Sequence, residues 1–424
     1  MERPLTQNIQ PGRDPLDLHG YEKAGGYQSV QKALKTLTPQ EVVEIVKKSN
    51  LKGRGGAGFP TGQKWSLVPT EREAPPPRYL IANADEMEPG TFKDRLLMEG
   101  DPHQLIEGMI LSAYAVQADK AIIFLRWAYN RPEALLDKAI QEAYRAGYLG
   151  QDILGSGFNL DLHLHISAGR YICGEETALL NALEGKRPIP RAKPPYPLVS
   201  GLFGRPTVVN NVETLCCIPH IVNRGPEWFL GLSRTDEGGT KIYGVSGKVK
   251  HPGAWELPLG TRLREIIEEH AGGMRDGLRL RGALPGGGST DFQVEEQLDV
   301  KLDFSHAVRS GSRLGTGMII VLDDKTCPVG FVLNLEHFFA LQSCGWCTPC
   351  REGLPWVEKT LSAIETGRGR PEDLRVLEDH VHDLGPGHTF CAHAAGAMEP
   401  LASALKYFRE DFERHIQTGS CPWK

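Results

Sequence analysis

The stretch Ser343-Cys344-Gly345-Trp346-Cys347-Thr348-Pro349-Cys350-Arg351 places three thiols at positions i, i+3 and i+6. At this spacing a helical turn or a tight loop lets all three sulfur atoms converge on one small object. Iron–sulfur clusters use such runs and take a fourth thiolate from elsewhere in the chain. Cys391 is a well-placed fourth ligand. The pattern therefore predicts a [4Fe–4S] cluster held by Cys344, Cys347, Cys350 and Cys391.

Two alternatives to the cluster stay open at this stage. A mononuclear zinc site more often combines two separated C-x-x-C or Cys/His pairs, but cysteine alone also binds zinc. The other alternative is a set of reduced, buried thiols without a metal. Gly345, Pro349 and Gly353 relax or turn the backbone beside the thiols. Nearby amides can then point at sulfide, which favours the cluster.

Length and composition limit the class of protein. The 424 residues are enough for two to four domains, and the net charge of −5 offers no basic field for nucleic acid. Nine cysteines in a chain of this length suit a reducing compartment better than a disulfide scaffold. The first eight residues lack the apolar core of a signal peptide, and no apolar run approaches the roughly 18 residues of a membrane helix. We expect a cytoplasmic protein that reaches a membrane only through partners.

A glycine-rich loop spans residues 52–65. Formally it matches the dinucleotide fingerprint G-x-G-x-x-G at Gly53, Gly55 and Gly58. The context of that fingerprint is missing, because the preceding segment looks helical and the acidic residues about twenty positions on lie in a Pro-rich loop, 71–77. We reject the ordinary dinucleotide fingerprint on these grounds.

The same loop suits an anion in another way. Consecutive glycine amides can form an anion-binding nest, and Arg54 and Lys64 add positive charge for phosphate groups. A flexible surface loop is the alternative. Phe59 and Trp65 argue against it, since such loops seldom place large aromatic side chains so close together.

Strand-like and helix-like segments alternate between residues 79 and 224. The expected strands are 79–83, 120–125 and 160–166. The expected helices are 102–116, 131–146, one opened by the turn 168–180, and one that follows residues 208–214 and contains Cys216 and Cys217. This alternation predicts a mostly parallel sheet with helices on both faces. Ligands bind such sheets at the carboxyl ends of the strands. Cys216 and Cys217 are adjacent, so we interpret them as core residues.

The remaining segments predict other kinds of structure. Residues 1–40 are polar and rich in Pro and Gly, which indicates an extended arm, and Thr38 begins a helix through residue 48. A hairpin at 241–257, a helix at 263–270 and a strand at 318–322 indicate a small α+β unit, with Gly286–Gly288 in a loop that lacks a neighbouring cation. Four helices follow, at 329–341, 354–366, 371–384 and 398–416, as a bundle with the cluster at one end.

The polar residues of the first part suit a flavin. Asparagines beside carboxylates can hydrogen-bond the edge of a flavin and the hydroxyl groups of its ribityl chain or of a ribose. The alternative is that these polar residues are scattered over the protein surface by chance and form no site. The sequence contains no Ser-His-Asp arrangement, no H-E-x-x-H motif and no Walker lysine motif. An iron–sulfur cluster transfers single electrons, whereas nicotinamide gives up two as hydride. A flavin is the natural converter between them.

Four long motifs, at 53–65, 83–95, 169–181 and 343–353, resemble the flavoprotein subunit of bacterial respiratory NADH:quinone oxidoreductase, complex I. The likeness extends over nearly the whole chain after about residue 20. It implies that the chain binds FMN, oxidises NADH and passes electrons singly to its own [4Fe–4S] cluster. It also implies an N-terminal arm and helix (1–50), a Rossmann-like FMN/NADH domain (51–235), a ubiquitin-like α+β domain (236–327) and a helical cluster domain (328–424).

The resemblance also implies roles for particular residues. Glu88 would be the catalytic residue that positions the nicotinamide. The flavin would be held by Gly53, Arg54, Gly55, Gly56, Lys64, Asn83, Asp85, Glu86, Gly174, Glu175, Asn210, Asn211 and Thr214. The dinucleotide would be faced by Gly56, Ala57, Gly58, Phe59, Glu88, Glu176, Lys193 and Tyr196. The two aromatic side chains offer rings on which an adenine could stack.

Partners follow from the same resemblance. They would be other peripheral-arm subunits of complex I, especially the small [2Fe–2S] subunit and the large iron–sulfur subunit, with no nucleic acid and no direct membrane insertion. A diaphorase subunit of a soluble NAD-linked hydrogenase or formate dehydrogenase is the nearest rival, although such subunits often contain extra cluster domains. A non-catalytic zinc-binding assembly protein is a more distant one. Cys421 has no role that the family assigns.

Overall fold

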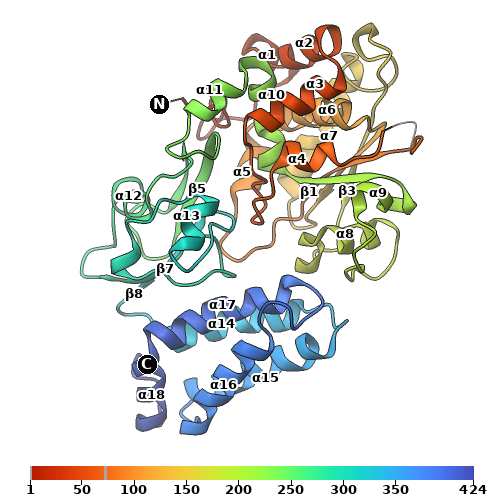
Figure 1. The fold of residues 1–424 in the computed structure, drawn as a ribbon. Helices are drawn as coiled ribbons and strands as arrows, with labels where there is room; N and C mark the ends of the chain where they lie inside the picture. The colour runs from red at the N-terminus through yellow and green to blue at the C-terminus, as the bar shows by residue number, and fades with distance from the viewer. Residues whose placement is uncertain (1, 71–73) are drawn as a thin grey trace. The chain divides into compact units, whose positions relative to one another are not determined.

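The computed structural model describes residues 2–70 and 74–424, so residues 71–73 of the expected Pro-rich loop lie outside the described part. The chain forms two compact units. The first comprises Met1–Met87, Phe92–Ile242 and Glu256–Gly260, and the second comprises Glu88–Thr91, Tyr243–Trp255 and Thr261–Lys424. Figure 1 shows the elements of both.

A four-stranded parallel sheet organises the first unit. Its strands are β1 (Tyr79–Ala84), β2 (Lys120–Leu125), β3 (Asp161–Ile166) and β4 (Thr207–Asn211), in the order β3-β2-β1-β4. Ile81 of the central strand aligns with Ile122 and Val209. The expected parallel sheet is thus confirmed, and all four strands point their carboxyl ends to the same edge.

Helices cover both faces of this sheet, as expected (Figure 1). Two of them, α6 (Pro102–Val116) and α10 (Val212–Arg224), pack against β1, and α7 (Asn130–Arg145) packs against β3. On the other face, Ile81 packs with Leu179 and Leu180 of α8 (Glu176–Leu183). Cys216 and Cys217 are buried, which confirms them as core residues.

The N-terminal segment contradicts the expectation of an extended arm. Residues 18–36 form two helices, α1 (Leu18–Lys23) and α2 (Gln28–Thr36). The Tyr27 ring stacks on Tyr148 at 3.9 Å, and the Tyr21 hydroxyl donates to Glu107 of α6 at 2.6 Å. The apolar face of these helices therefore folds back onto its own unit. The next helix, α3 (Pro39–Lys48), has the expected capping box between Thr38 and Glu41.

Short helices complete the first unit. They are α4 (Thr61–Ser66), α5 (Lys93–Gly100), α9 (Pro197–Ser200) and α11 (Pro226–Gly231), together with single 3₁₀ turns at Ile153–Gly155, Tyr171–Gly174 and Leu202–Gly204. The turn Tyr171–Gly174 leads directly into α8, so the expected glycine-rich turn before a helix is confirmed.

The second sheet has the order β6-β5-β8-β7. Its strands are β5 (Thr240–Ser246), β6 (Gly253–Pro258), β7 (Leu280–Leu284) and β8 (Met318–Asp323). The sequence did not predict β7, because it is short and contains a central glycine, which weakens a strand pattern. The expected helix at 263–270 is only one α-turn, α12 (Leu263–Glu265), followed by a π-turn (Ile266–His270). A short 3₁₀ turn (Glu295–Gln297) and the helix α13 (Phe304–Arg309) follow.

The last hundred residues form five helices rather than the expected four. They are α14 (Pro328–Gln342), α15 (Thr348–Glu365), α16 (Pro371–Asp383), α17 (Ala392–Tyr407) and α18 (Arg409–Thr418). The expected single helix 398–416 is divided at Phe408, whose φ of −126° and ψ of 22° leave the helical region. Among the described helices, none is long and apolar enough to cross a membrane.

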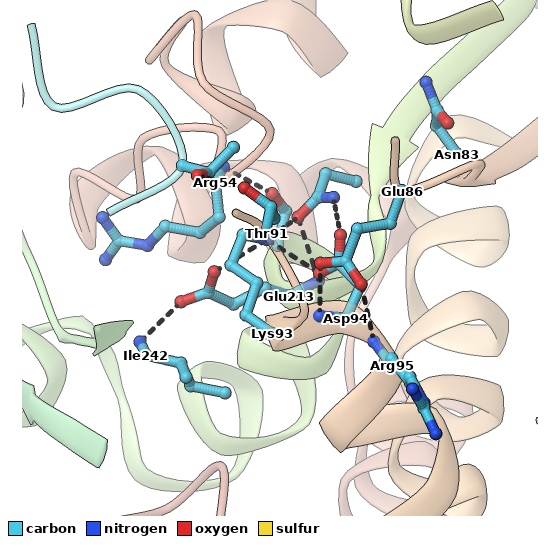
Figure 2. Close-up of polar contacts among 12 residues, drawn as sticks. Arg54, Asn83, Glu86, Thr91, Lys93, Asp94, Arg95, Glu213 and Ile242 are labelled. Carbon is cyan, nitrogen blue, oxygen red and sulfur yellow. Dashed lines mark hydrogen bonds and ion pairs between the residues drawn. The ribbon is translucent and has the colours of Figure 1, made fainter. Parts of the chain in front are cut away.

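A buried ionic network centred on Glu213 joins three elements of the first unit (Figure 2). The Glu213 carboxylate lies 3.0 Å from Lys93 of α5 and 3.0 Å from Lys241 of β5, and it accepts the Ile242 amide at 2.9 Å. All three charged side chains are fully buried. Burial alone would raise the pKa of Glu213, but Lys241, Lys93 and Arg54 outweigh it and lower the pKa to about 2.

Replacing Glu213 with alanine should lower the free energy of unfolding of the chain by about 3–5 kcal/mol, because two buried lysines lose their counter-charge. Denaturant titration of the purified protein measures this. Glu44→Ala, which breaks an exposed pair with Lys47, should cost less than about 1 kcal/mol. The stabilisation by Glu213 is present above about pH 4.5 and is lost as the pH falls toward 2. Equal costs for the two variants would contradict the network's importance.

Candidate flavin and cluster sites

The polar residues at the ends of β1 and β4 lie at one edge of the sheet. Asn83 aligns with Asn211, and Ala82 aligns with Asn210. Asp85 and Glu86 follow β1 directly. The expected gathering of these residues at the carboxyl edge is therefore found.

The glycine-rich loop lies against the same edge. Its ends are tied by the Gly53 amide, which donates to the Phe59 carbonyl at 2.9 Å. The Arg54 amide donates to the Thr214 hydroxyl at 2.8 Å. A Cβ on Gly55 would stand 3.2 Å from the Asn211 Cβ, so the backbone approaches β4 closely. Gly56 and Gly58 have φ values of +118° and +69°, which only glycine adopts readily.

The two cations of this loop have protein partners. The Arg54 guanidinium is buried and donates through Nη2 to the Gly238 and Thr240 carbonyls at 2.8 and 3.0 Å. Its Nε and Nη1 have no hydrogen-bond partner among the described residues. Lys64 Nζ lies 2.8 Å from Glu176 and 3.0 Å from the Val209 carbonyl. Phosphate binding by these two side chains remains a prediction.

The two asparagines at the end of β4 are held in place by their neighbours. Asn210 Oδ1 accepts from the Trp65 indole at 3.0 Å. Asn211 donates to Asp94 at 2.7 Å and accepts from Lys93 at 3.1 Å. Both side chains are thus oriented before any ligand binds.

Asp85 and Glu86 differ in their remaining hydrogen-bonding capacity. Asp85 Oδ1 accepts from the Ser167 hydroxyl at 3.0 Å, whereas its buried Oδ2 has no partner among the described residues. Burial raises the pKa of Asp85 to about 6, against the effects of Ser167 and Arg126. In contrast, the Glu86 carboxylate accepts three bonds, from Tyr129 at 2.9 Å and from the first amides of α5 at 2.8 and 3.0 Å. Glu86 therefore anchors α5.

The turn before α8 reaches the same edge. Asn83 donates to the Gly174 carbonyl at 3.3 Å. Glu175 caps α8 by accepting the Thr177 and Ala178 amides, each at 2.9 Å. Lys193 lies 3.1 Å from Glu175 and also 3.1 Å from Glu176. Burial opposes the ionised form of Glu176, but Lys64 and Lys193 outweigh it and lower its pKa.

The remaining dinucleotide candidates lie in different surroundings. Phe59 and Tyr196 are 50% and 58% exposed, so their rings are available for stacking. Ala57 belongs to the glycine-rich loop. Glu88 belongs to the second unit, where it accepts the Ser289 amide at 2.7 Å.

Arg313 donates to the Ser289 carbonyl, so the expectation that the loop Gly286–Gly288 has no neighbouring cation is wrong.

The residues at the sheet edge fit an FMN molecule. A flavin and its ribityl chain need hydrogen-bond acceptors for N–H and O–H groups. Asp85 Oδ2 is a buried acceptor with an unused lone pair. A Cβ added at Gly174 would meet no atom within 4 Å, so there is space beside it. Such an orphaned acceptor is costly unless a ligand satisfies it.

Three of the four cysteines lie at helix starts, and Cys344 lies in the segment between α14 and α15. Cys347 caps α15 and Cys391 caps α17, and Cys350 is in the first turn of α15. Burial and then the neighbouring Cys347, Cys391 and Cys344 raise the pKa of the Cys350 thiol to about 12. The other three thiols therefore lie close enough to Cys350 to act on its charge.

Their spacing favours a cluster over a single zinc ion. Zinc–sulfur bonds of about 2.3 Å keep the ligands of one zinc ion within about 4.6 Å of one another. Two groups of potential ligands in the described chain have all their ligand atoms within 4.8 Å, and neither contains any of these four cysteines. A [4Fe–4S] cluster, which is larger, fits the donor set.

Some residues that shape this region were not predicted as site residues from the sequence. They are Lys93, Asp94, Arg126, Ser167 and Glu213. Lys93 and Asp94 lie in a motif that supports the family resemblance, which is a signal that could have found them. Arg126 donates to the Glu86 carbonyl at 2.8 Å. It directly follows β2, so the rule that strand ends meet at one edge could have found it too.

Comparison with family models divides the chain into three matched regions. The Nuo51 FMN-binding domain matches residues 46–220, and the SLBB domain matches residues 242–293. The NADH-ubiquinone oxidoreductase-F iron-sulfur binding region matches residues 330–415. The first contains the glycine-rich loop and the sheet edge, and the last contains all four cysteines.

Curated relatives match over nearly the full length. The chain is 55% identical to the F subunit of NADH-quinone oxidoreductase from Salmonella typhimurium and from Escherichia coli over 414 residues, which is 98% of this chain and 93% of each relative. The protein of the same name from Mycobacterium bovis is 47% identical over 95% of this chain and 90% of its own length.

A solved structure shares the fold. The match is to a chain of NAD⁺-reducing [NiFe]-hydrogenase in the H₂-reduced state, with a TM-score of 0.81 and 35% identity over 94% of this chain. The likeness spans 65% of that hydrogenase chain. Taken with the site geometry and the curated relatives, this places the chain in the family of the NADH-quinone oxidoreductase F subunit.

Proposed function

We propose that this chain oxidises NADH by hydride transfer to FMN at the β1/β4 edge and delivers the electrons singly to a [4Fe–4S] cluster. The observation that supports this most directly is the orphaned, buried acceptor of Asp85 beside a glycine-rich loop, in one chain with four neighbouring cysteines. Bound FMN supplies the conversion between a two-electron donor and a one-electron acceptor. From the cluster the electrons continue toward quinone through partner subunits.

The residues of the chain bind and orient in this proposal. Asp85 accepts a hydrogen bond from the flavin, and the amides of Gly55 and Gly56 in the glycine-rich loop hold its phosphate end. Phe59 and Tyr196 stack on the dinucleotide, and Glu88 positions the nicotinamide. Glu176, together with Lys64 and Lys193, contacts the ribose of the adenosine half of the dinucleotide.

The partners and location follow from membership of a multi-subunit enzyme. We propose contacts with the small [2Fe–2S] subunit and the large iron–sulfur subunit, at the cytoplasmic side of the membrane. We also propose a Rossmann-like FMN domain at 51–235, a ubiquitin-like domain at 236–327 and a cluster domain at 328–424. A diaphorase role beside a hydrogenase is the second candidate, supported by the fold shared with the hydrogenase chain.

The visible spectrum of the purified protein tests the function. Flavin and iron–sulfur absorption that bleaches with NADH supports it, whereas a colourless, iron-free protein that is inert after cofactor reconstitution contradicts it. Electron delivery to quinone by the complex assembled with its neighbouring subunits separates the complex I role from the diaphorase role.

Asp85→Ala should weaken FMN binding about 10- to 150-fold, because a charged acceptor contributes about 1.5–3 kcal/mol to a hydrogen bond. Fluorescence titration of released and rebound FMN measures the affinity. Asp137→Ala, at an exposed position of α7, is the matched control. Unchanged FMN affinity in Asp85→Ala would remove Asp85 from the flavin site.

Glu176→Ala and Glu176→Gln should both raise the preference for NADPH over NADH by about tenfold or more, equivalent to about 1.4 kcal/mol. A carboxylate beside the adenosine ribose repels a 2′-phosphate. In the structure the removal of Glu176 also frees Lys64 of its carboxylate partner and leaves Lys193 with Glu175 alone, so both lysines can attract the phosphate. The ratio of kcat/KM for the two dinucleotides measures the effect, and an unaltered ratio would refute the role.

Cys391→Ala should abolish the electron paramagnetic resonance signal of the reduced cluster while FMN stays bound, since the thiolate lies in the other unit of the chain. Cys217→Ala, a buried core thiol, should keep the signal. A normal spectrum in Cys391→Ala would exclude that cysteine from the ligand set.

A further inference from the structure

A second group of potential metal ligands lies in the C-terminal helices. Cys327 caps α14, Glu365 ends α15, His415 lies on α18, and Cys421 lies in the tail that follows. Their ligand atoms all lie within 4.8 Å of one another. Glu365, His415 and Cys421 are buried, and Cys327 is partly buried.

The imidazole of His415 is oriented for metal binding. Its Nδ1 lies 2.6 Å from the Asp411 carbonyl, which can only accept, so Nδ1 bears the proton. In the neutral ring the lone pair of Nε2 then points toward Cys327 Sγ at 3.3 Å and Glu365 Oε2 at 3.1 Å. A backbone carbonyl that fixes the far nitrogen is the usual support of a metal-binding histidine. The Trp423 ring, stacked on His415 at 5.7 Å, further restricts its rotation.

The carboxylate of Glu365 directs one oxygen to the same point. Oε1 pairs with Lys424 at 2.9 Å, whereas Oε2 lies 3.2 Å from Cys327 Sγ. Cys327 Sγ also accepts the Gly330 amide at 3.2 Å, which leaves its other lone pairs toward the group. The neighbours thus orient the ligand atoms of His415, Glu365 and Cys327 inward.

The four ligand atoms bring more lone pairs than protons to one point. A neutral Nε2, a carboxylate oxygen and two sulfur atoms bring mainly lone pairs together, and the two thiols supply two protons at most. A divalent cation satisfies all four at once. Two thiolates, one imidazole and one carboxylate oxygen form a tetrahedral set typical of zinc, because thiolate ligands exclude magnesium and calcium.

We propose that Cys327, Glu365, His415 and Cys421 bind a structural zinc ion that fastens the C-terminal tail to α14 and α15. Four protein ligands leave no open position, so the site is structural rather than catalytic. The site is separate from the cluster, because the 15 residues of α14 between the two ligand sets measure about 22 Å. This inference does not depend on the proposed electron transfer.

Metal analysis of the purified full-length protein tests the site. We expect about one zinc ion per chain, with zinc-edge X-ray absorption showing sulfur at about 2.3 Å and nitrogen or oxygen at about 2.0 Å. Cys327→Ser and Cys421→Ser should each lose the zinc while iron and FMN stay at wild-type levels. The control His382→Asn, at an exposed histidine outside the group, should keep it.

Chelation of the wild-type protein gives an independent measurement that no folding defect can confuse. Removing zinc should expose Cys327 and Cys421 to alkylation, as identified by peptide mass spectrometry, and added zinc should protect both. Absence of zinc from zinc-replete protein, retention of zinc in both serine variants, or a disulfide between Cys327 and Cys421 in zinc-replete protein would each overturn the proposal. Loss of iron or FMN in the serine variants with zinc retained would overturn it as well.

Discussion

The carboxylate of Glu213 is the contact on which the ligand edge of the first unit depends. It balances Lys93 and Lys241 in a buried place, and its own backbone amide donates to Asn211 at 3.0 Å. Lys93 in turn reaches Asn211 at 3.1 Å. These charges therefore fix the orientation of the Asn211 side chain. Because Asn211 stays in place, the glycine-rich loop can approach β4 closely at Gly55.

The charges behind the edge are equal in number. Arg54, Lys93 and Lys241 are three buried cations, and Glu213, Asp94 and Glu86 are three buried carboxylates, with Glu86 also acting on Lys93. Burial and the neighbouring cations lower the pKa of Lys241 to about 8, with Glu213 opposing this effect. Removing any one of these charges would leave a buried partner unbalanced, which is costly.

Three ion pairs in the first unit are more exposed than this buried network. Lys64 and Lys193 neutralise Glu176 and Glu175 in partly exposed positions. Water and salt weaken such pairs, so a ligand can replace one partner at small cost. The buried pairs fix the scaffold, whereas the exposed pairs can exchange partners with a dinucleotide. The same division explains why Glu86, with three donors, acts as an anchor and Asp85, with one free oxygen, is available for a ligand.

The sequence predicted best what local patterns determine. The strands 120–125 and 161–166, the helix Pro102–Val116 and the capping box at Thr38 follow from alternation, periodicity and capping chemistry, which act over a few residues. It failed for the N-terminal helices, because α1 and α2 are held in place by Tyr21 and Tyr27, which pack on Glu107 and Tyr148, distant in sequence. It could not foresee the partners of Arg54 or the Glu213 network for the same reason. Cys327, Glu365, His415 and Cys421 are the clearest case. Their spacing of 38, 50 and 6 residues matches no short motif, and only the fold of α14, α15 and α18 brings their ligand atoms together.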